Sequence, residues 1–318
     1  MNDFLPWVEK YRPIYIDDII SHDQNIKTIK QLLKNNALPH LLFHGSPGTG
    51  KTSTINTIAQ EIYGDNIKFM IMKLDASDDR GINSVREDIK GFAEKSNMFY
   101  TGVKLIILDE ADAMTFDAQF ALRRIIEKYS STIRFCLICN YENKIIPAIR
   151  ARCANFRFSN ISSSFIYNKL KFISNNENLS YDDNAIKILS TLCNGDLRKS
   201  INSLQNISMQ NCYITEELCY SIMGTITNSD LNNIIDILTD KKLNFIQVYN
   251  QINKIIKIND YSLHNILKGL IPILIKKNNV ISIIVELSNL ENIITSSTFD
   301  DIYISLLVSI FRNNLSNM

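Results

Sequence analysis

The stretch from Leu41 to Ile55, LLFHGSPGTGKTSTI, decides the fold of the first half of the chain. Bulky apolar residues at its start are typical of a buried strand, and the residues after Lys51 have a helical pattern. Three glycines and a proline lie between the two, a composition that usually ends regular structure but here connects two elements. Gly45 to Thr52 fit the pattern G-x-x-x-x-G-K-S/T, in which backbone N–H groups and the next helix N-terminus bind phosphate. The stretch therefore predicts a nucleotide-binding α/β domain.

The side chains of this loop predict how a nucleoside triphosphate is held. Lys51 is expected to reach the β and γ phosphates, and the Thr52 hydroxyl is expected to ligate Mg²⁺. The glycines let successive N–H groups point into one concavity. The expected cofactor contacts are Gly45, Ser46, Pro47, Gly48, Thr49, Gly50, Lys51, Thr52 and Ser53.

A second segment, VKLIILDEAD (103–112), supplies the carboxylates that a metal-bound phosphate needs. Its apolar run predicts a buried strand that ends at Asp109 and Glu110. Asp109 is expected to hold Mg²⁺ through water, and Glu110 to orient and polarise the attacking water. The alternative is a pair of acids that cap the next helix, but the phosphate loop upstream favours catalysis.

Two nucleotide-dependent classes fit the sequence poorly. Residues 109–112 spell DEAD, yet a helicase of that name needs a second nucleotide-handling sheet domain, and helical patterns follow residue 160. A GTPase would carry N-K-x-D to recognise guanine, and that motif is absent from the sequence. Adenine is therefore the expected base.

Apolar runs alternate with helical patterns from about residue 38 to 158, which predicts a parallel sheet with helices on both faces. One helix is expected over 23–36. Another is expected over 116–129, with an apolar face made by Phe120, Ile125 and Tyr129 with Ala121 and Leu122. The expected strands are PHLLFH (39–44), KFMIMKLD (68–75), VKLIILD (103–109), IRFCLICN (133–140) and CANFRF (153–158).

The sequence changes character after about Ser159, where extended runs give way to helical periodicity and prolines almost vanish. We expect the sheet domain over residues 1–159, a small helical domain over 160–225 and a second helical unit over 226–318. No internal repeat is visible.

Composition limits the compartment and the partners. The chain of 318 residues is 45% hydrophobic and 21% charged, with no apolar run long enough for a membrane span and no secretory core at the N-terminus. A reducing compartment, cytosol or nucleus, is expected, so the six cysteines are expected to be thiols.

Cys136 and Cys139 lie in an apolar run without a second pair at zinc spacing, which favours core packing over metal binding. A net charge of +1 means that DNA contact would need a local basic stripe.

Several motifs go beyond a general ATPase and closely resemble the small subunits of replication factor C, the AAA+ clamp loader of eukaryotes and archaea. They occur in the family's order, dense over about residues 5–210 and thin beyond. Within the family, DDRGI (78–82), DEADAMT (109–115) and NY followed by KIIPA (144–148) most resemble the branch called subunit three in fungi and subunit five in animals. The motifs are LPWVEKYRP (5–13), GSPGTGKT (45–52), LDASDDRGINSVRE (74–87), LIILDEADAMTFDAQFALRRIIEKY (105–129), RFCLICNY (134–141) and GDLRKSINSLQ (195–205).

This resemblance implies roles for residues outside the phosphate loop. VEKYRP resembles a segment that packs on adenine and ribose through Val8, Tyr11 and Arg12, although an arm tied to the core would also suit it. Asn140 matches sensor 1, which holds the attacking water or γ-phosphate; by itself, an asparagine at the end of a strand would be a cap or turn residue. Arg198 matches sensor 2, where a guanidinium bonds two phosphate oxygens; the alternative is a surface arginine.

The resemblance also implies an arginine that acts on a neighbouring subunit. The family's Ser-Arg-Cys reads Ala151-Arg152-Cys153 here, so the arginine is kept and the serine is lost. Arg152 is expected to reach the adjacent subunit's ATP site in trans, where such a finger can raise the rate ~10³-fold or more. A solvated arginine beside Arg150 is the alternative. Ser46, where the family usually has proline, is a second departure.

DNA and clamp contacts are implied by two further segments. The helix over DASDDRGINSVREDIKGFAEKSNMFY (75–100) resembles the family's DNA-tracking surface, with phosphate contacts by Arg80, Arg86 and Lys90. Acidic residues among them leave an ordinary solvated face as the alternative. Arg124 resembles a basic residue that couples DNA to the ATP site. Met98, Phe99 and Tyr100 lie where the family meets the sliding clamp, or pack in the core.

Together these features predict an ATP- and Mg²⁺-dependent subunit of a nuclear hetero-pentamer with four other replication factor C subunits. Residues 160–225 would be its lid and 226–318 its collar. ATP binding would open the sliding clamp on primer–template DNA without sequence readout, and hydrolysis would release it. Two alternatives remain: another kind of AAA+ remodeller, which would want an aromatic pore loop, and a subunit that binds ATP without hydrolysing it. No membrane contact is expected.

Overall fold

A computed structural model describes residues 5–19, 21–35, 37–76, 81–94, 102–210, 213–259, 261–275, 281–294 and 300–314, without the side chains of 81–86, 300 and 301. The chain divides into two compact units. The first comprises Met1–Leu179 with Ile186–Gln205, and the second comprises Ser180–Ala185 with Asn206–Met318. Each unit is described by itself below.

The first unit contains a parallel sheet of five strands in the order β2-β3-β4-β1-β5. The strands are β1 (His40–Gly45), β2 (Ile71–Asp75), β3 (Lys104–Asp109), β4 (Ile133–Cys139) and β5 (Cys153–Phe158). The predicted parallel sheet is confirmed. One strand was predicted too long, because residues 68–70 belong to the short helix α4 (Ile67–Met70) rather than to β2.

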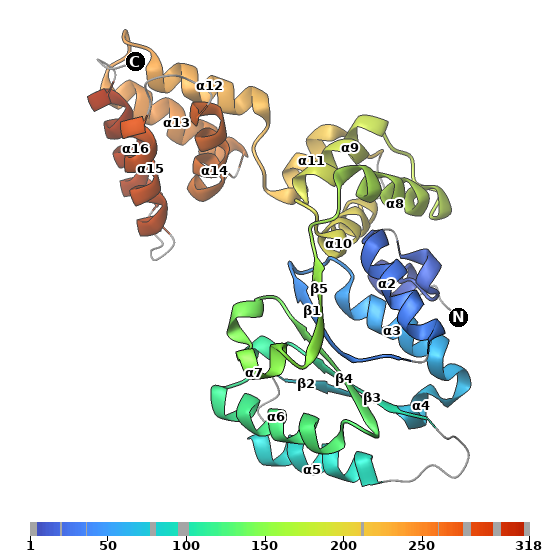
Figure 1. Cartoon of the computed structure of the whole chain (residues 1–318). Helices are drawn as coiled ribbons and strands as arrows, with labels where there is room; N and C mark the ends of the chain where they lie inside the picture. The colour runs from blue at the N-terminus through green and yellow to red at the C-terminus, as the bar shows by residue number, and fades with distance from the viewer. Residues whose placement is uncertain are drawn as a thin grey trace. The chain divides into compact units, whose positions relative to one another are not determined.

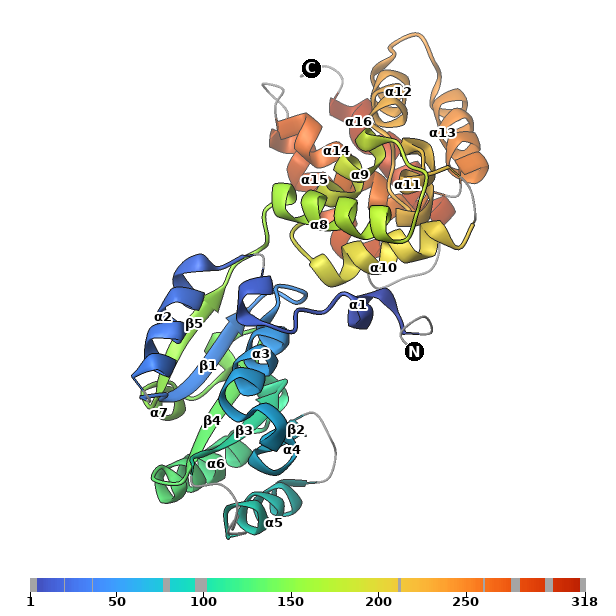
Figure 2. The same ribbon diagram turned by 90° about the vertical axis from the view of Figure 1, so that its right-hand side faces the viewer.

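Alternate residues of the strands face two separate cores, as the two-residue period of a strand requires. Leu41 and Phe43 of β1 pack with one core, and Leu42 packs with the other. Helices α2 (Asp23–Lys34), α3 (Lys51–Tyr63) and α4 cover the first face; α5 (Gly81–Glu94), α6 (Phe116–Tyr129) and α7 (Pro147–Arg150) cover the second (Figures 1 and 2). Both faces of the sheet are therefore covered, as predicted.

Helix α6 has the predicted bounds but not the whole of the predicted apolar face. Leu122 is buried, and Ile125 and Tyr129 pack against the same core, whereas Phe120 is 51% exposed. At about 100° per residue, Phe120 lies about 200° from Leu122 and so on the opposite side of the helix. The inclusion of Phe120 in the core face was wrong.

Cys136 and Cys139 are both buried, one in each core. Three residues apart on a strand, they point to opposite faces of the sheet and cannot chelate one ion. Burial raises the pKa of Cys139 to about 12 and the pKa of Cys136 well above its usual value. The observed packing is that of core thiols.

Within the described residues, the elements that follow β5 are helices, which confirms the predicted helical C-terminal region. They are α8 (Ser163–Asn176), α9 (Asp183–Leu192), α10 (Leu197–Ser208), α11 (Glu216–Met223), α12 (Asn228–Thr239), α13 (Phe245–Asn259), α14 (Leu263–Ile275), α15 (Ile281–Ile294) and α16 (Asp300–Asn314). The boundaries predicted at residues 159 and 225 stay predictions.

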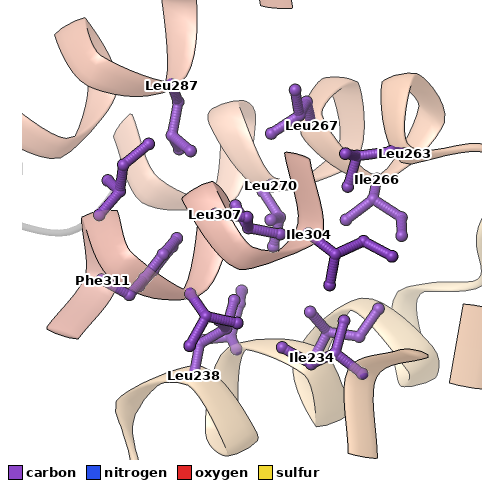
Figure 3. Close-up of a cluster of buried hydrophobic side chains, with 14 of the residues drawn as sticks. Ile234, Leu238, Leu263, Ile266, Leu267, Leu270, Leu287, Ile304, Leu307 and Phe311 are labelled. Carbon is purple, nitrogen blue, oxygen red and sulfur yellow. The ribbon is translucent and has the colours of Figure 1, made fainter. Parts of the chain in front are cut away.

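The second unit has its own core, in which Leu238 of α12, Leu270 of α14 and Phe311 of α16 are fully buried (Figure 3). Apolar residues at helical spacing on each helix make this core possible. No helix in the described part of the chain is long and apolar enough to cross a membrane.

Candidate nucleotide-binding site

A cavity of about 310 Å³ lies in the first unit, a size typical of small-molecule sites. Asp109 and Asn140 reach it from the carboxyl ends of β3 and β4, where ligands bind in open α/β sheets. Most of the residues predicted to contact nucleotide line it: Val8, Tyr11, Arg12, Pro47, Gly48, Thr49, Gly50, Lys51, Thr52, Ser53, Asp109, Glu110, Asn140 and Arg198. Gly45 and Ser46 are not among the lining residues.

Lys51 connects the phosphate loop to the end of β4. Its Nζ donates to the carbonyl oxygens of Gly45 at 2.7 Å and Ser46 at 2.8 Å, and to Asn140 Oδ1 at 3.0 Å. Burial lowers the pKa of Lys51, and the carboxylate of Asp109 opposes that shift. The phosphate loop and Asn140 thus hold the ammonium group in place. Phosphate oxygens of a bound nucleotide could replace these carbonyl and amide oxygens as its hydrogen-bond acceptors.

Thr52 and Asp109 come together from segments 57 residues apart, with Thr52 Oγ1 donating to Asp109 Oδ2 at 2.9 Å. A hydroxyl and a carboxylate are oxygen ligands of the kind Mg²⁺ prefers. Among the described residues, no group of three or more histidine, cysteine and acidic side chains could hold a metal alone. Because Mg²⁺ at nucleotide sites is usually held by one or two protein oxygens with phosphates, the pair fits such an ion.

Two neighbours shape the acidic end of the site. Glu110 has a φ of 53°, in the left-handed region, and its N–H donates to Asp109 Oδ1 at 3.0 Å. Asp112 Oδ2 accepts from the N–H groups of Asn140 at 3.2 Å and Tyr141 at 3.1 Å. The turn after β3 therefore fixes the backbone that carries the Asn140 amide, a role for Asp112 that the sequence did not reveal.

The N-terminal arm, residues 5–13, lines the cavity and is also tied to α8. Lys10 Nζ and Tyr11 Oη both donate to Glu177 Oε1, at 2.7 and 2.5 Å. Burial and the Glu177 carboxylate raise the pKa of Tyr11 to about 12. Its ring meets Phe172 edge-on at a centroid distance of 6.3 Å. The geometry therefore has features of both alternatives for this arm, nucleotide contact and attachment to the core.

Helix α10 begins against the phosphate loop and brings Arg198 to the cavity. The N–H of Leu197 donates to the Gly48 carbonyl at 3.2 Å. A Cβ on Gly48 would lie 1.8 Å from Asp196 Oδ1, and Gly48 has a φ of 67°. Gly48 thus meets two demands at once, a left-handed backbone and a close approach of the helix that carries Arg198.

The site agrees with what the chain is similar to. The model of the ATPase family associated with various cellular activities (AAA) matches residues 41–160. A probable replication factor C subunit 5 of Dictyostelium discoideum is 45% identical over 97% of this chain and 90% of its own length. Homo sapiens replication factor C subunit 5 is 40% identical over 97% and 92%, and Saccharomyces cerevisiae subunit 3 is 38% identical over 98% and 94%.

The chain belongs to the replication factor C subunits. The relatives are named subunit 5 in Homo sapiens and subunit 3 in Saccharomyces cerevisiae, which confirms the branch predicted from the sequence. Among solved structures, the Thermotoga maritima RuvB Holliday junction branch migration motor superposes with a TM-score of 0.54 at 15% identity, covering 76% of this chain and 85% of its own. That likeness shows the AAA+ fold alone.

Arg152 of this replication factor C subunit lies outside the cavity. One guanidinium nitrogen is 2.5 Å from Glu127 Oε1, and the other donates to the Ala148 carbonyl at 2.6 Å. Arg123 also donates to Glu127, at 3.0 Å. Arg152 therefore does not line its own chain's cavity, and its predicted action in trans stays a prediction.

The residues predicted to contact DNA and the clamp are only partly described. Lys90 on α5 and Arg124 on α6 are exposed. Arg80, the side chain of Arg86, and Met98, Phe99 and Tyr100 lie outside the described residues. Their roles in a replication factor C subunit stay predictions.

Some residues that line the cavity were not predicted from the sequence to contact nucleotide. Asp75 ends β2 beside Asp109 on β3, a position that strand alternation could have indicated. Asp18, Ile19, Ile161, Lys169, Leu197 and Ile201 also line the cavity, and they come from turns and helices brought in by tertiary packing.

Proposed function

We propose that this chain binds ATP with Mg²⁺ in the cavity and hydrolyses the ATP as a subunit of replication factor C, the clamp loader. ATP binding holds adjacent subunits in an arrangement that opens the sliding clamp and accepts primer–template DNA. Hydrolysis then releases the clamp closed on DNA. The partners are four other replication factor C subunits, and the compartment is the nucleus.

One observation carries the proposal. Thr52, Lys51, Asp109 and Asn140 converge on one cavity, with the Thr52–Asp109 and Lys51–Asn140 contacts at 2.9 and 3.0 Å. A phosphate loop, a metal-binding carboxylate and a polar residue on the intervening strand are the parts that phosphoryl transfer requires at one place.

The residues divide the work of hydrolysis. Loop N–H groups and Lys51 bind the phosphates, and Arg198 reads the γ-phosphate from α10. Glu110 orients and polarises the attacking water, which Asn140 helps to position. Thr52 and Asp109 would hold Mg²⁺, which when bound neutralises charge that develops on the phosphate oxygens. Val8, Tyr11 and Arg12 enclose the adenine and ribose.

Other roles of the chain depend on its assembly with the other subunits, DNA and the clamp. Arg152 acts in trans on the neighbouring subunit's ATP, which its position outside its own cavity supports. Arg80, Arg86, Lys90 and Arg124 contact the DNA backbone, and Met98, Phe99 and Tyr100 contact the clamp. Residues 1–159 form the ATPase domain, 160–225 the lid and 226–318 the collar that joins the subunits.

A comparison of two variants tests the ATPase itself. Glu110→Gln keeps every group proposed to bind ATP, so the full chain should bind ATP with nearly unchanged affinity in calorimetry. The assembled complex that carries it should lose the turnover contributed by this site, by a factor on the order of 10² or more. Lys51→Ala should instead lose ATP binding.

The outcomes separate the rival functions. If Glu110→Gln leaves turnover and clamp loading unchanged while Lys51→Ala abolishes assembly, the chain binds ATP only as a scaffold. If neither variant changes ATP uptake or turnover, the nucleotide site is wrong. Mass spectrometry of the purified complex should find four partners of similar type.

A further inference from the structure

Four cationic side chains line the nucleotide cavity, and they differ in what already engages them. Arg12 pairs with Glu9 at 3.0 Å. Lys51 donates to loop carbonyls and to the amide on β4. Arg198 and Lys169 have no hydrogen-bond or ion-pair partner within the part of the chain that the structure describes. Two cations of the cavity are therefore open to an acceptor from a ligand.

These two open cations have different neighbours in the cavity wall. Arg198 directly follows Leu197, whose N–H donates to the Gly48 carbonyl at 3.2 Å, so Arg198 lies beside the phosphate loop. Lys169 instead interacts with the carboxylate of Asp18, at the end of the 3-10 helix η1 (Ile16–Asp18) that follows the N-terminal arm. Arg198 thus lies near the phosphate loop, and Lys169 lies near the N-terminal arm.

Ring contacts place Lys169 more closely. Its Nζ is 5.4 Å from the centroid of the Phe172 ring, one turn further along α8. Phe172 in turn meets the Tyr11 ring edge-on. Lys169 therefore lies beside the aromatic pair that joins the arm to α8, where the adenine and ribose are expected.

Without a ligand, the burial of Lys169 costs free energy because its ammonium loses hydration. The side chain is half-buried, and burial lowers the pKa of its ammonium while Asp18 partly opposes the shift. A cation–π contact compensates part of the lost hydration, but it does not replace a hydrogen-bond acceptor. Because the amine is already partly desolvated, a bound molecule that supplies an acceptor here would form a hydrogen bond at a smaller desolvation cost.

We propose that Lys169 binds the nucleoside portion of the bound nucleotide, donating to a ribose oxygen or a ring nitrogen. An ammonium group can only donate, and these are the acceptors that a nucleoside offers away from its phosphates. The inference rests on the proposed nucleotide site and adds a binding residue to it from α8. Because ATP and ADP share the same nucleoside, Lys169 should contribute equally to both.

Calorimetric titration of the full chain with ATP and with ADP, each with Mg²⁺, tests the proposal. Lys169→Met should weaken both nucleotides by the same factor, roughly tenfold, the loss expected for one charge-assisted hydrogen bond. Arg198→Met should weaken ATP more than ADP. Lys171→Met is the matched control on the same helix, because Lys171 donates to the Tyr167 hydroxyl at 3.1 Å and does not line the cavity.

Two further measurements exclude a folding defect. Lys169→Arg keeps a donor and its charge, so it should retain most of the affinity. The melting temperature of Lys169→Met without nucleotide should stay close to that of the wild type.

The possible results distinguish this inference from the proposed function. Unchanged affinities in Lys169→Met, or a loss confined to ATP, would overturn the assignment of Lys169 alone. If the wild-type chain takes up neither nucleotide at millimolar concentration, the proposed nucleotide site falls and the role of Lys169 falls with it.

Discussion

His40 shows how a single side chain can make the sheet sensitive to pH. It begins β1, and its Nδ1 accepts the backbone N–H of Phe135 on β4 at 3.2 Å. Nδ1 can accept only when it carries no proton, so this contact needs the neutral ring. Burial, with a smaller contribution from the Arg134 guanidinium, lowers the pKa of His40 below its ordinary value. Burial also lowers the pKa of His22 and of His44.

Acidification should therefore destabilise the first unit. Above the unfolded-state pKa of about 6.5 the rings are neutral in both states, and the full stability is present. Below this pH the histidines bind protons in the unfolded chain but stay neutral in the native chain. The free energy of unfolding therefore falls, by up to about 1.4 kcal/mol per pH unit for each histidine. Melting temperatures between pH 8 and pH 5.5 should show this fall.

His40→Asn isolates one contribution, because the asparagine Oδ1 can accept the Phe135 N–H but does not titrate. The variant should match the wild type near pH 8 and lose less stability on acidification. Parallel pH profiles for the two proteins would contradict the assignment to His40.

At the scale of elements, α5 and α2 lie on opposite faces of the sheet and offer a matched comparison of exposed cations (Figures 1 and 2). Lys90 on α5 and Lys27 on α2 are both exposed. Of these two helices, only α5 carries residues predicted to face DNA, and Arg86 is one helical turn from Lys90.

Charge reversal of α5 should weaken DNA binding by the assembled complex. Arg86→Glu combined with Lys90→Glu should lower the affinity for primer–template DNA and reduce the slope of log K against log salt by about 2, because each phosphate contact contributes about 1. Lys27→Glu should leave the slope unchanged. Fluorescence anisotropy at several salt concentrations measures both, and equal slopes in all three proteins would remove α5 from the DNA surface.

At the scale of the whole molecule, the proposed ATP site needs an arginine from a second chain. The cavity of this chain is lined by the residues proposed to bind ATP but not by Arg152, which contacts Glu127 and the Ala148 carbonyl. A guanidinium has five N–H donors, so these two contacts leave donors for a neighbour's phosphate. The isolated chain should accordingly hydrolyse ATP slowly.

Arg152→Ala should leave ATP binding by its own chain unchanged and lower turnover at the adjoining site of the complex, by up to ~10³-fold. Steady-state ATPase of the isolated chain and of the complex measures the difference. Arg150→Ala is the control; within the described residues, the Arg150 side chain has one ion pair, a 3.5 Å contact with Glu142. Robust ATPase activity in a proven monomer would argue against a finger supplied in trans.

The sequence predicted the strands and the phosphate loop well because short-range patterns encode them. Alternating or continuous apolar runs specify strands, and the glycines around Lys51 specify one loop conformation. It failed at the start of β2, where Lys68, Phe69 and Met70 suit a strand as well as a helix end. It also misplaced Phe120, because apolar character alone does not reveal which side of a helix meets the core.

By itself, the sequence determined the AAA+ sheet, the helical region after it and membership of the replication factor C subunits. Those follow from local periodicity and from motifs whose spacing is read along the chain. Only the tertiary structure decided that Asp196 packs against Gly48, that Glu127 engages Arg152 and that Lys169 opens onto the cavity. Such contacts join residues far apart in sequence, and which of them form is settled when helices pack against the sheet and each other.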